Sequence, residues 1–421
     1  MPEDAWRIVG GKPLRGKVKP SGSKNGALPT LAATLLVDGE TVLHNVPRIA
    51  DVQTMIALLT AVGLSVTEDD DSSVRIVNHG ITTHKAPADL VGKMRASHYL
   101  LGPMLLRLGR AQMAMPGGCN LGSRPVTHIT SVLEALGATG TSSDSGIEMS
   151  AKGLRGSVVT LDPRHRNPGA TFTALMTASM ADGETVIENA SYEPDVVNFC
   201  GFLNAAGARI EGSGGPQLTV AGVDRLRGVD HRVNSDRLEV GTLICAAAAT
   251  RGQVTVEDTS LADLGETASK LQEAGVELIP QGEGLMAACP TRTRGVDIVT
   301  DPFPAFSTDL QPVMAALLAT AEGESTIVET VFDRRLQYAY ELAKMGASID
   351  LHDSRHATIR GVERLRGAAV DGANIRDGAA LVVAALGAEG ESTVAGTRFI
   401  ARGYESLDEK LRSLGANVES V

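Results

Sequence analysis

The sequence predicts an α/β protein of six similar units, each about 70 residues long, assembled by threes into two globular halves. Three features recur in the same order along the chain and predict this fold class. Glycines that end helices recur 68 to 74 residues apart, at Gly63, Gly137, Gly207, Gly275, Gly346 and Gly415. A strand start of the form Gly-Glu-Thr/Ser recurs at Gly39, Gly183, Gly323 and Gly390. The phrase Leu-Arg-Gly recurs at Leu14, Leu154, Leu226 and Leu365, with a degenerate Thr293-Arg294-Gly295.

Residues 154–223 show the order of elements within one unit. Alternating apolar residues predict strands, apolar residues at helical spacing predict helices, and Gly or Pro marks their ends. The expected elements are a strand at 157–162, a helix at 170–180, a strand at 184–188, a helix from 194 to 207, and a hairpin of 209–212 with 217–220. This order is βαβαββ, and such a unit cannot cover its own apolar faces, so we expect the copies to pack together. In this scheme Leu14 opens the first unit and Leu226 opens the fourth.

Length, charge and cysteine content narrow the class of protein. At 421 residues the chain is too long for one hydrophobic core, which favours two domains. A net charge of −11 argues against binding of duplex nucleic acid, and no apolar stretch is long enough to cross a bilayer. The four cysteines form no C-x-x-C pair, so we expect neither a zinc site nor a disulfide framework, and a reducing cytoplasm fits best. The acidic start has no apolar core and does not read as a signal peptide.

The stretch 116–125 is the most unusual loop of the sequence. It contains three glycines, two prolines, Cys119 and Arg124. Free cysteines usually lie in apolar cores, whereas Cys119 has few apolar neighbours in sequence. A thiol beside a cation in a mobile loop is a candidate nucleophile or proton donor, and the alternative is an unreactive loop cysteine.

The turn before the first helix of each unit carries a different polar residue from copy to copy. Such a turn offers free backbone N–H groups and the positive end of the helix dipole, which suits an anion. Scaffold residues should repeat with the scaffold, so a position that varies in this way indicates function. Each arginine alone is explained by a surface salt bridge, and Lys24 alone by a solvated side chain, but the set indicates anion recognition. The residues are Lys24, Arg95, Asn167, Arg237, Asp309 and Arg376, with Arg335 and Arg402 after the second strands of the fifth and sixth units.

Together these residues resemble the enolpyruvyl transferases, and most closely the branch that acts on UDP-N-acetylglucosamine. The resemblance covers nearly the whole chain. The sister branch that makes enolpyruvyl-shikimate phosphate is less similar, because it lacks the cysteine loop and this form of the Lys-Asn pair. The most specific pieces are Ser21-Gly22-Ser23-Lys24-Asn25, Met94-Arg95-Ala96-Ser97, Pro116-Gly117-Gly118-Cys119 with Arg124-Pro125, Phe306-Ser307-Thr308-Asp309 and Arg402-Gly403-Tyr404-Glu405.

The resemblance implies a two-domain inside-out α/β barrel, with helices in the core of each domain and sheets facing outward. One domain would comprise residues 22–233 and carry the Cys119 loop, and the other would comprise 1–21 plus 234–421 and carry Asp309. Substrates would bind where helix N-termini of both domains converge, and the domains would close over them. The implied partners are phosphoenolpyruvate and a uridine-nucleotide acceptor, with no metal and no other cofactor.

The resemblance also implies roles for single residues. Cys119 would give a proton to the methylene carbon of phosphoenolpyruvate or transiently take the enolpyruvyl group, and Asp309 would accept the proton of the acceptor hydroxyl. Fosfomycin, an epoxide mimic of phosphoenolpyruvate, is expected to alkylate Cys119. Lys24, Arg124 and Arg402 would hold the phosphate and carboxylate, Arg95, Arg335 and Arg376 would support the anionic site, Asn25 would orient the sugar, and Pro125, Val126, Asn167 and Gly169 would complete the acceptor site.

The chain departs from the family pattern mainly at the acceptor end. The family usually has Ser-Val-Gly, Asp-x-His and Asp-Leu-Arg where this chain has Asn167-Pro168-Gly169, Thr127-His128-Ile129 and Asn374-Ile375-Arg376. The expected function is enolpyruvyl transfer to the 3-hydroxyl of UDP-N-acetylglucosamine, the first committed step of peptidoglycan precursor synthesis. Two alternatives remain: transfer to the 3′-hydroxyl of UMP, as in nucleoside-antibiotic pathways, and an inactive homologue that only binds a nucleotide sugar.

Overall fold

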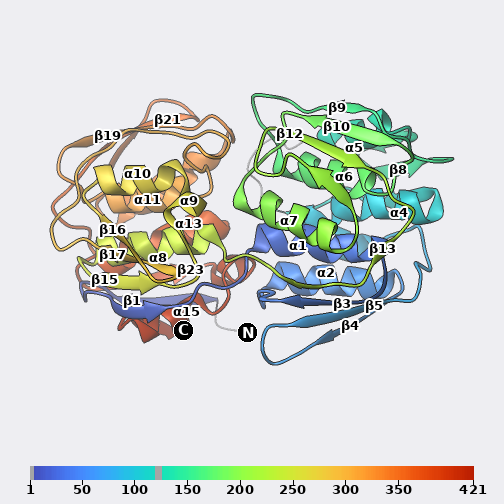
Figure 1. The fold of residues 1–421 in the computed structure, drawn as a ribbon. Coiled ribbons are helices and arrows are strands. Elements are labelled where there is room, and N and C mark those ends of the chain that lie inside the picture. The colour runs from blue at the N-terminus through green and yellow to red at the C-terminus, as the bar shows by residue number, and fades with distance from the viewer. Residues whose placement is uncertain (1–3, 119–125) are drawn as a thin grey trace. The chain divides into compact units, whose positions relative to one another are not determined.

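The computed structural model describes residues 4–118 and 126–421, which form two compact units (Figure 1). The Asp309 unit comprises described residues 4–21 and 235–421, and the Lys24 unit comprises 22–118 and 126–234. The chain therefore crosses after residue 21 and after residue 234, whereas the family resemblance implies a second crossing after residue 233. Asn234 belongs to the Lys24 unit because its carbonyl accepts from the Ser23 N–H at 2.7 Å and its amide donates to Asp195 Oδ1 at 2.9 Å.

The described part of the Asp309 unit contains three four-stranded sheets. In each sheet the first two strands of a repeat run parallel and the remaining pairings are antiparallel. The strand orders are β22 (Ala369–Asp371), β23 (Glu391–Ala395), β1 (Ala5–Val9), β24 (Asn417–Ser420); β16 (Glu277–Gln281), β17 (Gly284–Ala288), β15 (Gln253–Val256), β2 (Arg15–Val18); and β18 (Ile298–Val299), β19 (Glu324–Val328), β21 (His356–Arg360), β20 (Ser348–Leu351).

The described part of the Lys24 unit repeats this arrangement. In its second repeat, a single parallel bridge from Lys85 to Gln112 stands where the other sheets have a full first strand. The strand orders are β11 (Arg209–Glu211), β12 (Gln217–Ala221), β10 (Glu184–Glu188), β9 (Val158–Thr160); β13 (Leu226–Arg227) with β14 (Asp230–Arg232), β3 (Val37–His44), β5 (Val74–Asn78), β4 (Leu64–Glu68); and β6 (Arg110–Met113), β8 (Gly146–Ser150), β7 (Thr139–Ser143).

The opening strands of the first and fourth repeats are exchanged relative to the sequence-based scheme. The strand after Leu14, β2, pairs in parallel with β15 of the Asp309 unit, and the strand at Leu226, β13, pairs in parallel with β3 of the Lys24 unit. The expectation that Leu14 opens the first repeat is therefore wrong. A periodic motif shows that a strand is present, but it does not show which of two equivalent sheets the strand joins.

The recurring glycines have a common physical cause. A Cβ atom on Gly156, Gly228, Gly295 or Gly367 would lie 1.9 to 2.3 Å from the carbonyl oxygen of the glutamate in the Gly-Glu-Thr/Ser strand start. The Leu-Arg-Gly phrase therefore marks the place where the first strand of a repeat meets the second at close range. The six glycines predicted to end helices all have φ between 90° and 118°, which confirms them as left-handed stops.

The helices follow the predicted order of two per repeat, with short additional turns. In the Lys24 unit they are α1 (Lys24–Ala33), η1 (Thr34–Leu36), α2 (Ala50–Ala61), α3 (Ala88–Val91), η2 (Arg95–Leu100), α4 (Leu101–Leu108), α5 (Thr127–Ala135), α6 (Pro168–Ala178) and α7 (Pro194–Ala205). In the Asp309 unit they are α8 (Arg237–Ala249), α9 (Leu261–Leu264), α10 (Glu266–Glu273), α11 (Gln311–Leu318), η3 (Arg335–Gln337), α12 (Tyr338–Lys344), α13 (Ile375–Gly387), α14 (Thr397–Ile400) and α15 (Leu407–Ser413).

The first helix of each repeat lies in the core of its unit. In the Asp309 unit, α8, α11 and α13 contact one another, and nearly all of their residues are buried. In the Lys24 unit, α1 and α6 are similarly buried, and both contact η2. A helix that is apolar on all sides must be covered on all sides, so these helices form the interior of their units. Among residues 4–118 and 126–421, no helix combines the length and apolar character needed to span a membrane.

Candidate active site

In the Asp309 unit, the Asp309 carboxylate lies between two buried arginines. Arg335 Nη2 donates to Asp309 Oδ1 at 2.5 Å, and Arg376 Nη2 donates to Oδ2 at 3.0 Å. The Arg335 and Arg376 side chains are 1% and 8% exposed, whereas that of Asp309 is 27% exposed. Three predicted residues from separate segments are thus joined directly. Asp309 lies in the turn before α11, Arg335 at the start of η3 and Arg376 at the start of α13. The carboxylate keeps access to solvent while its two cations are fixed in protein.

Buried polar groups hold Asp309 and Arg335 in place. Glu329 follows β19, is fully buried, and accepts from the Thr308 hydroxyl at 2.9 Å and from the backbone N–H groups of Val331 and Phe332 at 2.8 and 3.0 Å. Arg335 Nε in turn donates to Thr308 Oγ1 at 3.3 Å. Because the Glu329 carboxylate accepts several hydrogen bonds, its burial is compensated, and through Thr308 it anchors the turn before α11.

Arg376 is positioned from the N-terminus of α13. Asn374 caps this helix, since its Oδ1 accepts from the N–H groups of Arg376 and Asp377 at 3.0 and 3.1 Å. Arg376 Nη1 donates to Tyr404 Oη at 3.3 Å, and Tyr404 is 2.9 Å from Thr242 Oγ1. Burial opposes the charge of Arg376, but the neighbouring Asp309 carboxylate, followed by Tyr404 and Asp236, raises its pKa overall. Arg376 is therefore a permanent cation at this site.

Arg402 belongs to the turn that packs on the same helix start. A Cβ atom on the next residue, Gly403, would lie 2.7 Å from Ile375 Cγ2, the first residue of α13. This close approach brings the Arg402 turn beside the start of α13, which carries Arg376. Four of the predicted site residues (Asp309, Arg335, Arg376 and Arg402) therefore gather at the N-terminal ends of α11 and α13.

In the Lys24 unit, Lys24 is the first residue of α1. Ser23 caps the helix through a hydrogen bond from the Gly26 N–H to its hydroxyl at 3.2 Å. The Lys24 ammonium lies 2.6 Å from Asp51 Oδ2, in the first turn of α2, and both side chains are largely buried. Lys24 lies at a helix start, where the sequence placed it, but its pairing with Asp51 was not evident in the sequence. Asn25 follows Lys24 and is half-buried.

Arg95 and the Asn167 turn are linked through one histidine. Arg95 begins η2, and its carbonyl oxygen lies 2.7 Å from His98 Nδ1. The other ring nitrogen of His98 would lie 3.4 Å from a Cβ atom on Gly169, in the first turn of α6. Asn167 caps α6 through the Ala170 N–H at 3.1 Å. These helix starts lie against each other, and the predicted acceptor-site residues Asn167 and Gly169 lie beside Arg95.

The remaining predicted residues are less informative. Val126 precedes α5 with its side chain 3% exposed in the core, so a ligand could reach it only through the backbone. Cys119, Arg124 and Pro125 lie outside the described residues. The residues that sequence reasoning missed, Asp51 and Glu329, are isolated acids next to apolar residues. Their only signal was position, at a helix start and at a strand end.

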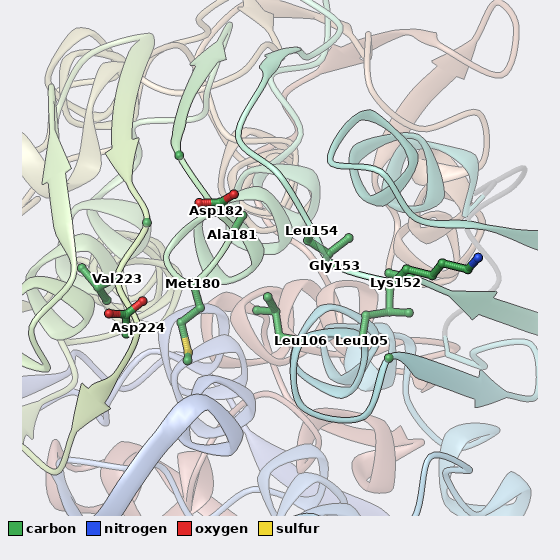
Figure 2. Close-up of a pocket in the computed structure, with 14 residues that line it drawn as sticks. Leu105, Leu106, Lys152, Gly153, Leu154, Met180, Ala181, Asp182, Val223 and Asp224 are labelled. Atoms are coloured by element: carbon green, nitrogen blue, oxygen red, sulfur yellow. The ribbon is translucent and has the colours of Figure 1, made fainter.

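Described residues of the Lys24 unit also line a cavity. It has a volume of about 620 Å³ and lies beyond the C-terminal ends of α4 and α6, at the opposite end of α6 from Asn167 (Figure 2). Leu105, Leu106, Lys152, Met180 and Asp182 are among its lining residues. None of the predicted catalytic or substrate-binding residues lines it, so the concave shape alone does not identify the chemistry of this protein.

Comparison with known proteins agrees with the geometry. Residues 8–411 match the family model described as EPSP synthase (3-phosphoshikimate 1-carboxyvinyltransferase). The chain belongs to this family of enolpyruvyl transferases. It is 44% identical to the UDP-N-acetylglucosamine 1-carboxyvinyltransferase of Paracoccus denitrificans, over 98% of this chain and 97% of the relative. It is 42% identical to the protein of the same name from Halorhodospira halophila, over 98% of both chains.

Solved structures of the family share the fold. The enolpyruvyl transferase NikO from Streptomyces tendae superposes with a TM-score of 0.90 at 26% identity, covering 100% of this chain and 99% of its own. EPSP synthase from Acinetobacter baumannii superposes with a TM-score of 0.76 at 18% identity, covering 99% of both chains, which shows the fold alone. The predicted mixed α/β fold and the predicted family are therefore confirmed.

Proposed function

We propose that this protein transfers the enolpyruvyl group of phosphoenolpyruvate to the 3-hydroxyl of UDP-N-acetylglucosamine and releases phosphate. The observation that carries the proposal is the 44% identity, over nearly the full length of both chains, to a relative named for that reaction. The cluster of Asp309 with Arg335 and Arg376 supplies the base and the anion-binding groups that the chemistry needs. In this proposal the enzyme catalyses the first committed step of peptidoglycan precursor synthesis and works in the cytoplasm. Its proposed architecture is a two-domain inside-out α/β barrel with three repeats per domain.

In the proposed reaction, a proton adds to the methylene carbon of phosphoenolpyruvate and positive character develops on the neighbouring carbon. The acceptor hydroxyl attacks that carbon and gives its proton to Asp309. Loss of phosphate and of a methyl proton from the tetrahedral intermediate then restores the vinyl group. Cys119 is the proposed proton donor to the methylene carbon, since a free thiol titrates near pH 8.5 and is protonated at neutral pH.

Arg335 and Arg376 have two roles in this proposal. They bind the phosphate and carboxylate of phosphoenolpyruvate, together with Lys24, Arg124 and Arg402. They also control Asp309, because a carboxylate between two guanidinium groups is a weak base. An anionic substrate that attracts Arg335 and Arg376 would relieve Asp309 of part of this charge. Base strength would then rise only when substrate is bound. The proposed reaction uses no metal and no other cofactor.

A second acceptor is favoured by two observations. The NikO structure matches with a TM-score of 0.90, and the turns expected to meet the nucleotide depart from the pattern of the UDP-N-acetylglucosamine branch at Thr127, His128, Ile129, Asn167 and Pro168. A changed nucleotide pocket would suit transfer to the 3′-hydroxyl of UMP. The rest of the proposed chemistry would be the same for this acceptor.

The two acceptors are separated by measuring phosphate release from phosphoenolpyruvate with UDP-N-acetylglucosamine and with UMP side by side. We expect turnover with the nucleotide sugar and at most a trace with UMP. Turnover with UMP alone would show that UMP is the acceptor and that the reaction is still enolpyruvyl transfer. Binding of both nucleotides without phosphate release would show that the protein is an inactive homologue.

A further inference from the structure

The cavity beyond the C-terminal end of α6 corresponds to a place that an arginine fills in another repeat. In the fifth repeat, Arg292 donates to backbone carbonyl oxygens in the two segments that follow α11 and β21. Its Nε donates to Thr320 O at 2.6 Å, and its Nη2 donates to the carbonyl oxygens of Ala321, Gly361 and Val362 at 2.8, 3.2 and 2.7 Å. A guanidinium group suits such a set of acceptors because its N–H donors are planar and share one positive charge.

The backbone of the third repeat forms the same hydrogen bonds around its cavity. From N–H to carbonyl, the matching bonds are Gly156 to Asp182, Asp182 to Leu154, Gly222 to Gly183 and Val223 to Ser179 in the third repeat, and Gly295 to Glu322, Glu322 to Thr293, Gly361 to Gly323 and Val362 to Ala319 in the fifth. The residues equivalent to the acceptors of Arg292 are therefore Met180, Ala181, Gly222 and Val223, and all of them line the cavity.

The third repeat has a glycine where the fifth has its arginine. Gly153 and Arg292 both lie three residues before the glycine that ends the Leu-Arg-Gly phrase or its degenerate form. The first and sixth repeats also have arginine at this position, Arg225 and Arg364. Gly153 lines the cavity, so the space that an arginine side chain fills in the fifth repeat is open in the third.

The acid that meets these arginines is nevertheless present in the third repeat. Arg225 pairs with Asp38 at 2.8 Å, and Arg364 pairs with Glu389. Asp38, Glu389 and Asp182 each lie two residues before the glutamate of a Gly-Glu-Thr/Ser strand start. Within residues 4–118 and 126–421, no donor hydrogen-bonds to the Asp182 carboxylate or to the four carbonyl oxygens that line the cavity. The acceptors of a guanidinium group are thus in place without their donor.

The surroundings of the cavity favour a cation with an apolar chain. The C-terminal end of α6 presents the negative end of the helix dipole. Asp182 and Asp224 line the cavity, and Lys152 points away from both acids (Figure 2). The volume of about 620 Å³ exceeds that of a guanidinium group and lies in the range of small-molecule sites. Leu105 and Leu106 supply an apolar wall for the rest of such a ligand.

We propose that this cavity binds a small molecule that carries a guanidinium group on a short apolar chain. The guanidinium group donates to the four carbonyl oxygens and pairs with Asp182, as arginine side chains do in the other repeats. The chain lies against Leu105 and Leu106. This site is separate from the proposed enolpyruvyl transfer, because none of the predicted catalytic or substrate-binding residues lines the cavity.

The first test compares three ligands on the full-length protein at constant ionic strength. Butylguanidinium chloride carries the charge and the planar donors, butylurea keeps the planar shape without the charge, and butylammonium chloride keeps the charge without the planar donors. In ligand-observed NMR titrations we expect a Kd of about 1 mM for butylguanidinium and binding about tenfold weaker for the other two. Equal affinity for all three ligands would overturn the proposal.

A pair of matched variants locates the binding site. Asp182→Asn should weaken butylguanidinium binding about tenfold because it removes the carboxylate that pairs with the guanidinium group. Asp144 is an exposed acid between β7 and β8 of the same unit and does not line the cavity, so Asp144→Asn should leave the Kd unchanged. An unchanged Kd in Asp182→Asn would contradict binding at this cavity.

The reverse experiment supplies the guanidinium group from the chain itself. Gly153 has a φ of 154°, so any side chain strains the backbone there, but no heavy atom lies within 4 Å of a Cβ atom at this position. Gly153→Ala carries the same backbone strain and serves as the control. Gly153→Arg should no longer bind butylguanidinium, and its melting temperature should exceed that of Gly153→Ala by about 3 °C. Equal binding by both variants would refute the proposal, and if Gly153→Arg did not fold, Asp182→Asn would still decide.

Discussion

Lys24 with Asp51 and Asp309 with Arg335 occupy the same two places in different repeats. In each pair, the first residue lies at the start of the first helix of the repeat and the second at the start of the second helix. Lys24 Nζ and Asp51 Oδ2 are 2.6 Å apart, and Arg335 Nη2 and Asp309 Oδ1 are 2.5 Å apart. The scaffold and the spacing are alike, but the sign of each charge is reversed.

The difference shows how one repeated frame serves two tasks. The Lys24 ammonium is paired with Asp51, so a bound phosphate must compete with that acid for it. The Asp309 carboxylate is shared by two guanidinium groups because the next repeat contributes Arg376. In that sixth repeat both places hold arginine, Arg376 and Arg402. The frame fixes where the two groups lie, and the side chains at these places decide whether a repeat binds anions or accepts a proton.

The largest effect on turnover should come from the Asp309–Arg335 pair. Replacing Asp309 by alanine removes the proposed base, and we expect kcat for phosphate release to fall about 10³-fold, within the range for general-base groups. Binding of UDP-N-acetylglucosamine, measured by calorimetry, should persist because Arg335 and Arg376 remain. Near-normal turnover in this variant would show that Asp309 is not the base.

The Lys24 pair should matter for stability as well as for binding. Asp51→Asn leaves a largely buried ammonium without its acid, so we expect the free energy of unfolding to fall by about 3 kcal/mol. The double variant Lys24→Met with Asp51→Asn should recover part of this loss, which a double-mutant cycle in urea measures. Losses that simply add would mean that the two side chains do not interact.

A third buried ion pair, Glu239 with Lys410, extends the comparison to a pair that has no proposed role in binding substrate. It holds Ser21, whose N–H donates to Glu239 Oε2 at 3.1 Å and whose hydroxyl accepts from Lys410 Nζ at 2.6 Å. Burial raises the pKa of Glu239 to about 7, although Lys410 opposes the shift. The raised pKa means that the folded state favours the protonated acid. The resulting stability is complete below pH 4.5 and is lost as the pH rises through 7.

Glu239→Gln should therefore gain stability relative to the wild type between pH 4.5 and 7, by as much as about 3 kcal/mol. Urea unfolding at these two pH values measures the gain. The exposed acid Glu283, in the turn between β16 and β17, provides the control, since Glu283→Gln should show the same difference from the wild type at both values. A wild type that becomes more stable than Glu239→Gln over this range would contradict the raised pKa.

The smallest effect on stability should come from the cap of α1, next to Lys24. The hydroxyl of Ser23 caps α1, whereas α11 after Asp309 has no side-chain cap. Ser23→Ala should lower the free energy of unfolding by about 1 kcal/mol, and Ser23→Asp should restore the cap. Equal stability of Ser23→Ala and the wild type in urea would show that the cap does not support this helix.

The repeat pattern made most of the fold predictable. The helix-ending glycines and the Leu-Arg-Gly phrases reflect local backbone requirements, so they were visible in the sequence. The repeat pattern alone did not show the exchange of β2 and β13, because both strands carry the same motif and fit equivalent sheets. The domain bounds implied by the family resemblance, 1–21 with 234–421 and 22–233, do place each strand in the unit where it lies. The cations and Asp309 stood out because they broke the repeat. Asp51 and Glu329 did not, because an acid at a helix start or a strand end is ordinary until the fold shows what its carboxylate contacts.

The central claim is that the Asp309 cluster carries out enolpyruvyl transfer to a nucleotide sugar. The most direct measurement is NMR of the product formed from ¹³C-labelled phosphoenolpyruvate and UDP-N-acetylglucosamine by the wild type and by Asp309→Ala. We predict that the wild type gives a vinyl ether on the 3-oxygen of the sugar and that the variant gives almost none. A wild type that leaves both substrates unchanged, or a variant that forms the ether at the same rate, would contradict this account.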